Sequence, residues 1–190
     1  GFNLSCVGDE RAYSHIESRM GGTLADSALQ AAMIGLDNIK KYSFLDRGSD
    51  ERQYCAPGVD LPFCGFCRTK YEVFTEYHTS ADNFDVVTSK GLEGSFGVMK
   101  SIIDSFEIGL FPMVNVICEP QLGKRELRPT ISQKGYSHDA NIRADLIAYA
   151  DGKHSLFDIS NKINKSLELI LSEVKILKDN KLINLYKNKI

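Results

Sequence analysis

The sequence lacks tryptophan, long apolar runs and a marked excess of either charge. Its 190 residues include 23 Lys or Arg and 25 Asp or Glu, which gives a formal net charge of −2. A chain with balanced charge has no strong field that would attract nucleic acid or an acidic membrane surface. No apolar stretch approaches the roughly 20 residues that a membrane-spanning helix needs. We therefore expect no membrane partner.

Cysteine is scarce and irregularly spaced. The cysteines are Cys6, Cys55, Cys64, Cys67 and Cys118. An odd number at irregular spacing is a poor disulfide framework and fits a reducing compartment, so we expect a cytoplasmic protein. Cys64 and Cys67 have the C-x-x-C spacing, but no second pair completes a four-thiolate zinc site. We interpret both as loop thiols.

The chain opens with "GFNLSCVGDE", without an initiator Met or the basic start of a signal peptide. This opening has the pattern of a β-strand already under way. We therefore expect the sequence to begin inside a domain and treat it as a C-terminal fragment. Its length allows one ordinary domain and a small second one.

Strand and helix patterns alternate in the first part of the chain. The apolar run from Phe2 to Gly8 predicts a buried strand with Asp9 at its C-terminal end. Residues 22–39 have helical apolar spacing, and Lys40 and Lys41 suit the C-terminus of that helix.

A second amphipathic helix is predicted from about Leu92 to Leu110. Its apolar residues are spaced four and three apart, at Leu92, Phe96, Met99, Ile103, Phe106 and Leu110. "FPMVNVICEP" then predicts a last strand, which Pro120 stops. Alternating helices and buried strands indicate an α/β domain over residues 1–130, with its site at the C-termini of the strands.

The last part of the chain has a different character. Residues 119–137 are rich in Pro, Gly and charge and are interpreted as a linker. Ser155 and Asp158 have the spacing of a capping box, and a further helix is predicted from Ser166. "NKLINLYKNKI" can close as a small β-ribbon. Short helices followed by a ribbon predict a winged helix-turn-helix over residues 136–190.

Two residues are candidates for metal binding. His78 lies in "EYHTSADN" with Asp82 four residues downstream, and an imidazole supported by a carboxylate is a common zinc ligand. The alternative is a turn shaped by Thr79 and Asp82 that carries a surface histidine. Asp9 is costly to bury unless it is paired or binds a metal. Its alternative is a capping or salt-bridged role.

The order "GDE … GSDERQYCAPGVDLP … EYHTSADN" resembles the second half of the two-zinc aminopeptidase superfamily, which also contains the glutaminyl cyclases. With "EPQLGKR" and the winged helix, the chain resembles the aminopeptidase-like proteins of bacterial polysaccharide-biosynthesis loci. The resemblance covers essentially all 190 residues. It implies the C-terminal part of an aminopeptidase-like α/β/α sandwich of the phosphorylase/hydrolase type.

The resemblance also implies roles for single residues. Asp9 and His78 would each bind one of two zinc ions, and the full-length protein would hydrolyse an amide bond of a peptide-like or amino-sugar-like substrate. Asp82 and Thr79 would support the metal site, and Ser49 and Asp50 would lie at the pocket rim. The superfamily also needs another His, a bridging Asp and a Glu as ligands, with a second Glu as general base. These would lie before Gly1, so we expect no catalytic residue in this chain and no activity from it alone.

Two further interpretations remain open. The chain can be an inactive aminopeptidase-like scaffold whose winged helix binds other proteins or forms a homo-oligomer. It can instead bind DNA through the helix "SLELILSEVKILKDN". That helix contains no arginine and mixes acidic residues with lysines, whereas phosphate binding needs clustered Lys or Arg. We therefore do not expect specific binding to nucleic acid.

Overall fold

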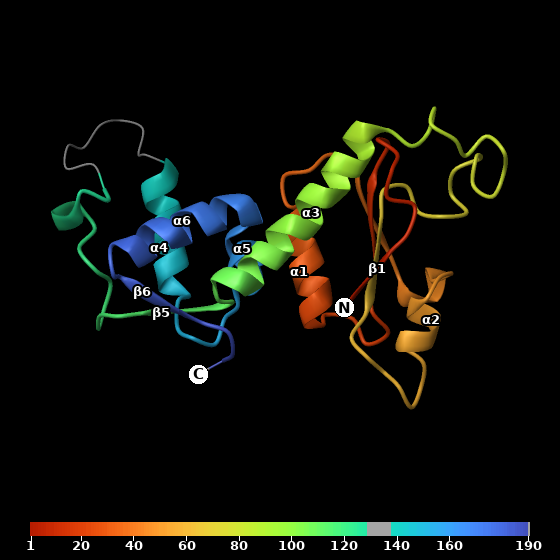
Figure 1. Cartoon of the computed structure of the whole chain (residues 1–190). Helices are drawn as coiled ribbons and strands as arrows, with labels where there is room; N and C mark the ends of the chain where they lie inside the picture. The colour runs from red at the N-terminus through yellow and green to blue at the C-terminus, as the bar shows by residue number, and fades with distance from the viewer. Residues whose placement is uncertain (129–137, 190) are drawn as a thin grey trace. The chain divides into compact units, whose positions relative to one another are not determined.

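The structure, a computed structural model, describes residues 1–128 and 138–189 (Figure 1). These residues form two compact units, Gly1–Ile102 and Ile103–Ile190. The first unit is a mixed α/β structure and the second is built mainly of short helices. The α/β fold class and the C-terminal winged helix expected from the sequence are therefore confirmed. No helix among the described residues combines the length and the apolar character needed to cross a membrane.

The first unit contains a sheet with the strand order β1-β4-β2-β3. The strands are β1 (Phe2–Leu4), β2 (Tyr13–Ile16), β3 (Ile39–Tyr42) and β4 (Cys64–Cys67). β1 is parallel to β4 and β2 is parallel to β3, but β2 and β4 are antiparallel. The predicted first strand is present but ends at Leu4, so Asp9 lies in the following loop.

α1 (Leu24–Met33) begins at Thr23, which forms a reciprocal capping box with Asp26. The predicted continuation of this helix to residues 39–41 was wrong, because those residues form β3. Gly35 and Asn38 have φ values of 89° and 55°, a left-handed conformation that ends the helix and turns the chain. The short helices η1 (Phe44–Asp46) and α2 (Glu51–Tyr54) precede β4.

α3 (Ser89–Ile108) is present as predicted, but a different face of it is buried. The predicted apolar face is largely exposed, including Leu92, Phe96, Ile103 and Phe106. In the first unit the buried face of the helix instead contains Val98 and Ile102 together with small residues. A Cβ on Gly91 would lie 1.9 Å from the Gly8 carbonyl oxygen, and the Ser95 hydroxyl donates to the Val7 carbonyl at 2.6 Å. The small residues allow the helix to contact the backbone that leads to Asp9.

The second unit contains β5 (Phe111–Val114), η2 (Gly123–Arg125), α4 (His138–Ala148), α5 (Leu156–Ile163), α6 (Leu167–Asp179) and β6 (Ile183–Tyr186). β5 pairs antiparallel with β6. The strand at "FPMV" therefore belongs to the winged helix and does not end the α/β sheet, and "INLY" pairs with it rather than forming a ribbon alone. The predicted capping box of Ser155 and Asp158 is confirmed at α5. Part of the predicted linker, residues 129–137, lies outside the described residues.

Candidate functional site

Asp9 is buried in the loop between β1 and β2, with 4% of its surface exposed. Its carboxylate accepts hydrogen bonds from the Arg11 backbone N–H at 2.9 Å, the Thr69 backbone N–H at 2.8 Å and the Thr69 hydroxyl at 2.7 Å. Thr69 follows β4 and is 60 positions from Asp9 in the sequence. A distant segment of the chain therefore fixes the direction of the Asp9 carboxylate. These bonds account for its burial without a charged partner.

Arg11 connects this loop to the segment that carries His78. Its guanidinium donates to both carboxylate oxygens of Glu76, at 3.0 and 2.7 Å. The hydrogen bonds from Arg11 lower the pKa of Glu76 to about 2. Since Glu76 is two residues before His78, this ion pair fixes the start of the histidine turn beside the Asp9 loop.

His78 lies on an exposed turn in an unusual conformation. Its φ of 58° is in the left-handed region, which residues other than glycine seldom adopt. Its ring stacks on Tyr77 with a centroid distance of 3.9 Å and an interplanar angle of 17°. Thr79 shapes the turn, because its hydroxyl donates to the Glu76 carbonyl and accepts from the Ala81 N–H.

Cys6 lies in the same loop as Asp9, three residues before it. Burial raises the pKa of its thiol, and the negative charges of Asp82 and Asp9 raise the pKa further. Cys6 and Tyr77 also pack against the same buried cluster of Ile16, Cys67 and Tyr71. The charges of Asp9 and Asp82 therefore both act on this thiol, although Asp82 itself is exposed.

The "GSDE" segment contributes a residue that the sequence did not single out. Asp50 is exposed and Ser49 is half-buried, whereas Glu51 is fully buried. Glu51 accepts from the Tyr71 hydroxyl at 2.8 Å, from the Gly48 N–H at 3.1 Å and from the Ser49 N–H at 3.2 Å. Burial alone would raise the pKa of Glu51, but these hydrogen bonds together lower it. The only signal in the sequence was a second acidic residue after Ser49.

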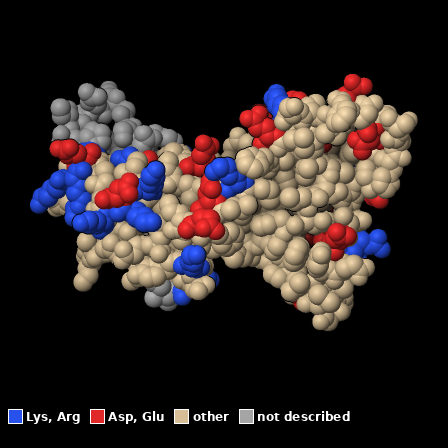
Figure 2. All heavy atoms as spheres, viewed as in Figure 1, with Lys and Arg blue, Asp and Glu red and all other residues tan. Residues whose placement is uncertain are grey.

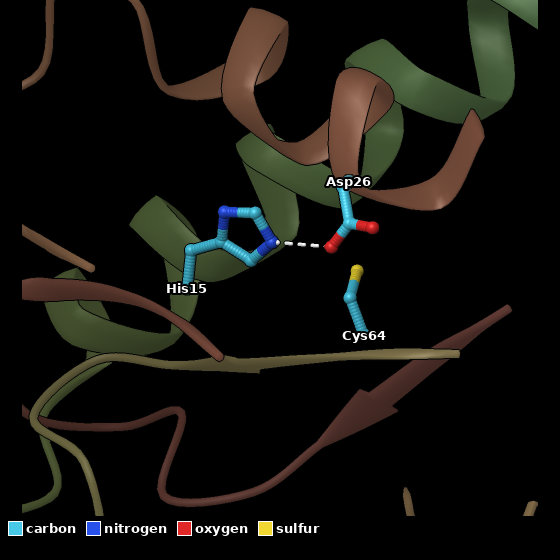
Figure 3. Close-up of side chains that lie close together, drawn as sticks. All are labelled: His15, Asp26 and Cys64. Atoms are coloured by element: carbon cyan, nitrogen blue, oxygen red, sulfur yellow. Dashed lines mark hydrogen bonds and ion pairs between the residues drawn. The ribbon is translucent and has the colours of Figure 1, made fainter. Parts of the chain in front are cut away.

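A second group of polar side chains lies in the core of the first unit (Figure 3). His15 on β2, Asp26 on α1 and Cys64 on β4 are all fully buried, and their ligand atoms lie within 4.8 Å of one another. The interpretation of Cys64 and Cys67 as loop thiols was therefore wrong, because both lie in β4 and are buried. Burial raises the pKa of the Cys64 thiol, which keeps it neutral.

The hydrogen bonds of Asp26 identify this group as structural. Its carboxylate accepts from His15 Nε2 at 2.9 Å and from the N–H and hydroxyl groups of both Ser18 and Thr23. A carboxylate offers about four lone-pair positions, so no position is left for a metal ion. Burial would raise the pKa of Asp26, but the bonds from His15, Ser18 and Thr23 lower it below its ordinary value.

Comparisons with known proteins cover both units. Residues 1–109 match the family described as "Domain of unknown function (DUF4910)", and residues 111–185 match a winged helix-turn-helix family. A Clostridium acetobutylicum protein, named for polysaccharide biosynthesis and an aminopeptidase-like domain, is 32% identical over 165 residues. That match covers 85% of this chain and 38% of the relative.

A crystal structure from the same organism, described as a peptidase, has a similar fold. It aligns with a TM-score of 0.79 and 29% identity over 97% of this chain and 41% of the solved chain. The chain thus spans about two fifths of the length of the proteins it matches. Because the family match covers more than half of the residues, the chain belongs to the DUF4910 family and carries a C-terminal winged helix-turn-helix domain.

Proposed function

We propose that this chain is part of a zinc-dependent, aminopeptidase-like hydrolase that cleaves an amide bond in a polysaccharide-precursor context. The names of the relative and of the solved structure support the reaction class. The observation that carries the proposal is the Arg11–Glu76 ion pair, which joins the loop of Asp9 to the turn of His78. In this proposal Asp9 and His78 each contribute one ligand to a pair of zinc ions.

Both side chains fit a role as metal ligands. Asp9 accepts three hydrogen bonds, which leaves about one lone-pair position for a metal. Ligating carboxylates are commonly held by such outer hydrogen bonds. The exposed His78 ring can present a nitrogen to a metal while it stacks on Tyr77. Asp82, Ser49, Asp50 and Thr79 remain proposed supporting residues.

In the proposed site, bound zinc would supply an activated water and polarise the amide carbonyl of the substrate. The residues of this chain would act by positioning. Thr69 and the Arg11 backbone fix the direction of the Asp9 carboxylate, and the Arg11–Glu76 pair holds the turn that presents His78. The remaining ligands and a general base would come from another part of the full-length protein.

The metal content of the full-length protein tests this proposal. We expect two zinc ions per chain in the wild-type protein, and loss of zinc from the His78→Ala variant with its fold intact by circular dichroism. His154→Ala, in the winged helix, is the matched control and should retain both ions. Full zinc occupancy and unchanged amidase turnover in His78→Ala would contradict the assignment of His78.

For the winged helix we propose a role in binding other proteins, including a second copy of this chain. Figure 2 shows Lys and Arg side chains interspersed with Asp and Glu over the surface of the second unit. In α6, Lys175 and Lys178 share the helix with Glu168, Glu173 and Asp179. Mixed charge of this kind does not favour phosphate binding. A gel-shift titration that showed tight, salt-resistant DNA binding would refute the proposal, and sedimentation of the intact protein would show self-association.

A further inference from the structure

A pocket of about 370 Å³ opens on the first unit beside the Asp9 loop. Its lining includes Arg11, Ser14, Asn38, Lys40, Tyr42 and Phe74. Ser14 on β2 and Lys40 on β3 are register partners, so their side chains share one face of the sheet. His15 and Lys41, the next register pair, belong to the opposite face, where His15 contacts α1. The pocket is therefore separate from the buried group of His15, Asp26 and Cys64.

The side chains of the pocket carry positive charge without a lining carboxylate. Arg11 and Lys40 line it, and Arg11 is paired with Glu76. Lys40 forms no ion pair with a carboxylate of the residues that the structure describes. Lys40 is thus the charged side chain of the lining that has no carboxylate partner among the described residues, and it favours an anionic ligand.

A third cation lies behind the pocket wall. Lys70 is 5% exposed, and its Nζ lies 5.6 Å from the centre of the Tyr42 ring and 4.1 Å from that of Tyr71. Its hydrogen bond is to the Tyr71 carbonyl at 3.3 Å, and it too has no ion pair with a described carboxylate. Among the described residues its contacts are ring faces and a carbonyl, so this side chain adds to the positive potential at Tyr42.

The pocket also has an apolar wall. Tyr42, Val73 and Phe74 line it, and the Arg11 guanidinium lies 6.0 Å from the centre of the Phe74 ring. A flat or branched apolar group can pack on these side chains while its charge meets Lys40. A bare inorganic anion would leave this wall unused.

The pocket shares two residues with the surroundings of Asp9. Thr69 and Arg11 both line it and both donate to the Asp9 carboxylate. A ligand in the pocket would therefore lie next to the proposed metal ligand.

We propose that this pocket binds a small organic carboxylate, with its charge at Lys40 and its apolar body on Tyr42 and Phe74. The further assignment of this carboxylate as the acidic group of the hydrolase substrate rests on the proposed function. Binding itself needs no metal, so the two proposals can fail separately.

Titration of the full chain with phenylacetate, after treatment with a chelator, tests the pocket. We expect amide NMR shifts at Lys40, Tyr42 and Phe74. Phenylacetamide has the same shape without the charge, and we expect it to bind roughly tenfold more weakly or not at all. Inorganic phosphate is the third probe, and we expect it to bind more weakly than phenylacetate. Phosphate binding as tight as that of phenylacetate would refute the organic ligand in favour of a simple anion site.

Two neighbouring lysines on β3 provide a matched pair of variants. Lys40→Gln should weaken phenylacetate binding about fivefold to tenfold because a charge-assisted contact is lost. Lys41→Gln changes the exposed lysine of the opposite face and should leave binding unchanged. Equal effects of the two variants, equal binding of phenylacetamide, or shifts confined to other residues would overturn the proposal. If phenylacetate binds as expected but His78→Ala retains zinc, the pocket stands and the proposed function does not.

Discussion

Arg11 and Glu76 are 65 residues apart in the sequence and form a two-bonded ion pair between adjoining loops of the first unit. One loop contains the buried Asp9 and the other turns at His78. Arg11 also donates its backbone N–H to Asp9, so one residue contacts Asp9 and the segment that leads to His78. The pair is partly exposed, and we therefore expect it to act on local geometry more than on global stability.

Removal of this pair should change the titration of Glu76. In the wild-type protein the pKa of Glu76 is about 2, compared with 4.5 for an unperturbed glutamate. A depressed pKa means that the pair stabilises the loops fully above about pH 4.5 and loses this effect as the pH falls through about 2. Arg11→Gln should raise the pKa of Glu76 toward its ordinary value, as measured by carboxyl NMR. Arg19→Gln, whose partner is Asp60, should leave it unchanged.

Glu51 should matter more for stability than its neighbour Asp50. In Glu51→Ala the carboxylate is lost, and with it Oε1, which accepts hydrogen bonds from Tyr71, Gly48 and Ser49. We expect a loss of about 2–3 kcal/mol in the free energy of unfolding, because buried donors lose their acceptor. Asp50→Asn, at an exposed position, should change it by less than about 0.5 kcal/mol. Urea unfolding measures both, and equal losses would show that the Glu51 contacts contribute little.

The buried group around Asp26 gives a third prediction. Asp26→Asn should cost about 2–3 kcal/mol, because an amide nitrogen then faces either the Ser18 N–H, which bonds Oδ1, or the Thr23 N–H, which bonds Oδ2. His15→Leu should cost less than about 1 kcal/mol. It removes one bond to Asp26 but also removes Nδ1, which is buried without a partner in the described structure. A larger loss in His15→Leu than in Asp26→Asn, measured by thermal unfolding, would contradict the structural role given to Asp26.

Two glycines of α3 should respond to alanine with opposite signs. Gly91→Ala places a Cβ against the Gly8 backbone and should destabilise the first unit by about 1–3 kcal/mol. A Cβ on Gly97 meets no atom within 4 Å, and Gly97→Ala should stabilise the helix by about 0.5–1 kcal/mol. Denaturant unfolding of the two variants checks the sign. Similar effects of both would mean that α3 does not pack closely on the Asp9 loop.

Local patterns in the sequence predicted the structural features that depend on residues close together in the chain. The capping box at Ser155 and the first strand are examples, since each is decided by a few consecutive side chains. The burial of Asp9 was also expected, although its partner Thr69 could not be identified because it follows a different strand. The roles of Asp9 and His78 in metal binding stay predictions.

Contacts between distant segments could not be predicted from spacing alone. The burial of His15 is one example, because Asp26 on α1 gives its ring a partner in the core. β5 was assigned to the α/β sheet because its partner β6 is some 70 residues away. In α3 the apolar periodicity predicted the wrong buried face, since the close backbone contacts of Gly91 and Ser95 turn the face of Val98 and Ile102 inward instead.

This arrangement of α3 reverses the usual pattern of mutational tolerance along a helix. Large apolar positions such as Phe96 should accept polar replacements, whereas Gly91 should accept nothing larger. Substitution tables that score positions by hydrophobicity would rank these two residues in the wrong order. A saturation library of this helix would therefore separate close backbone packing from apolar burial as the cause of evolutionary constraint.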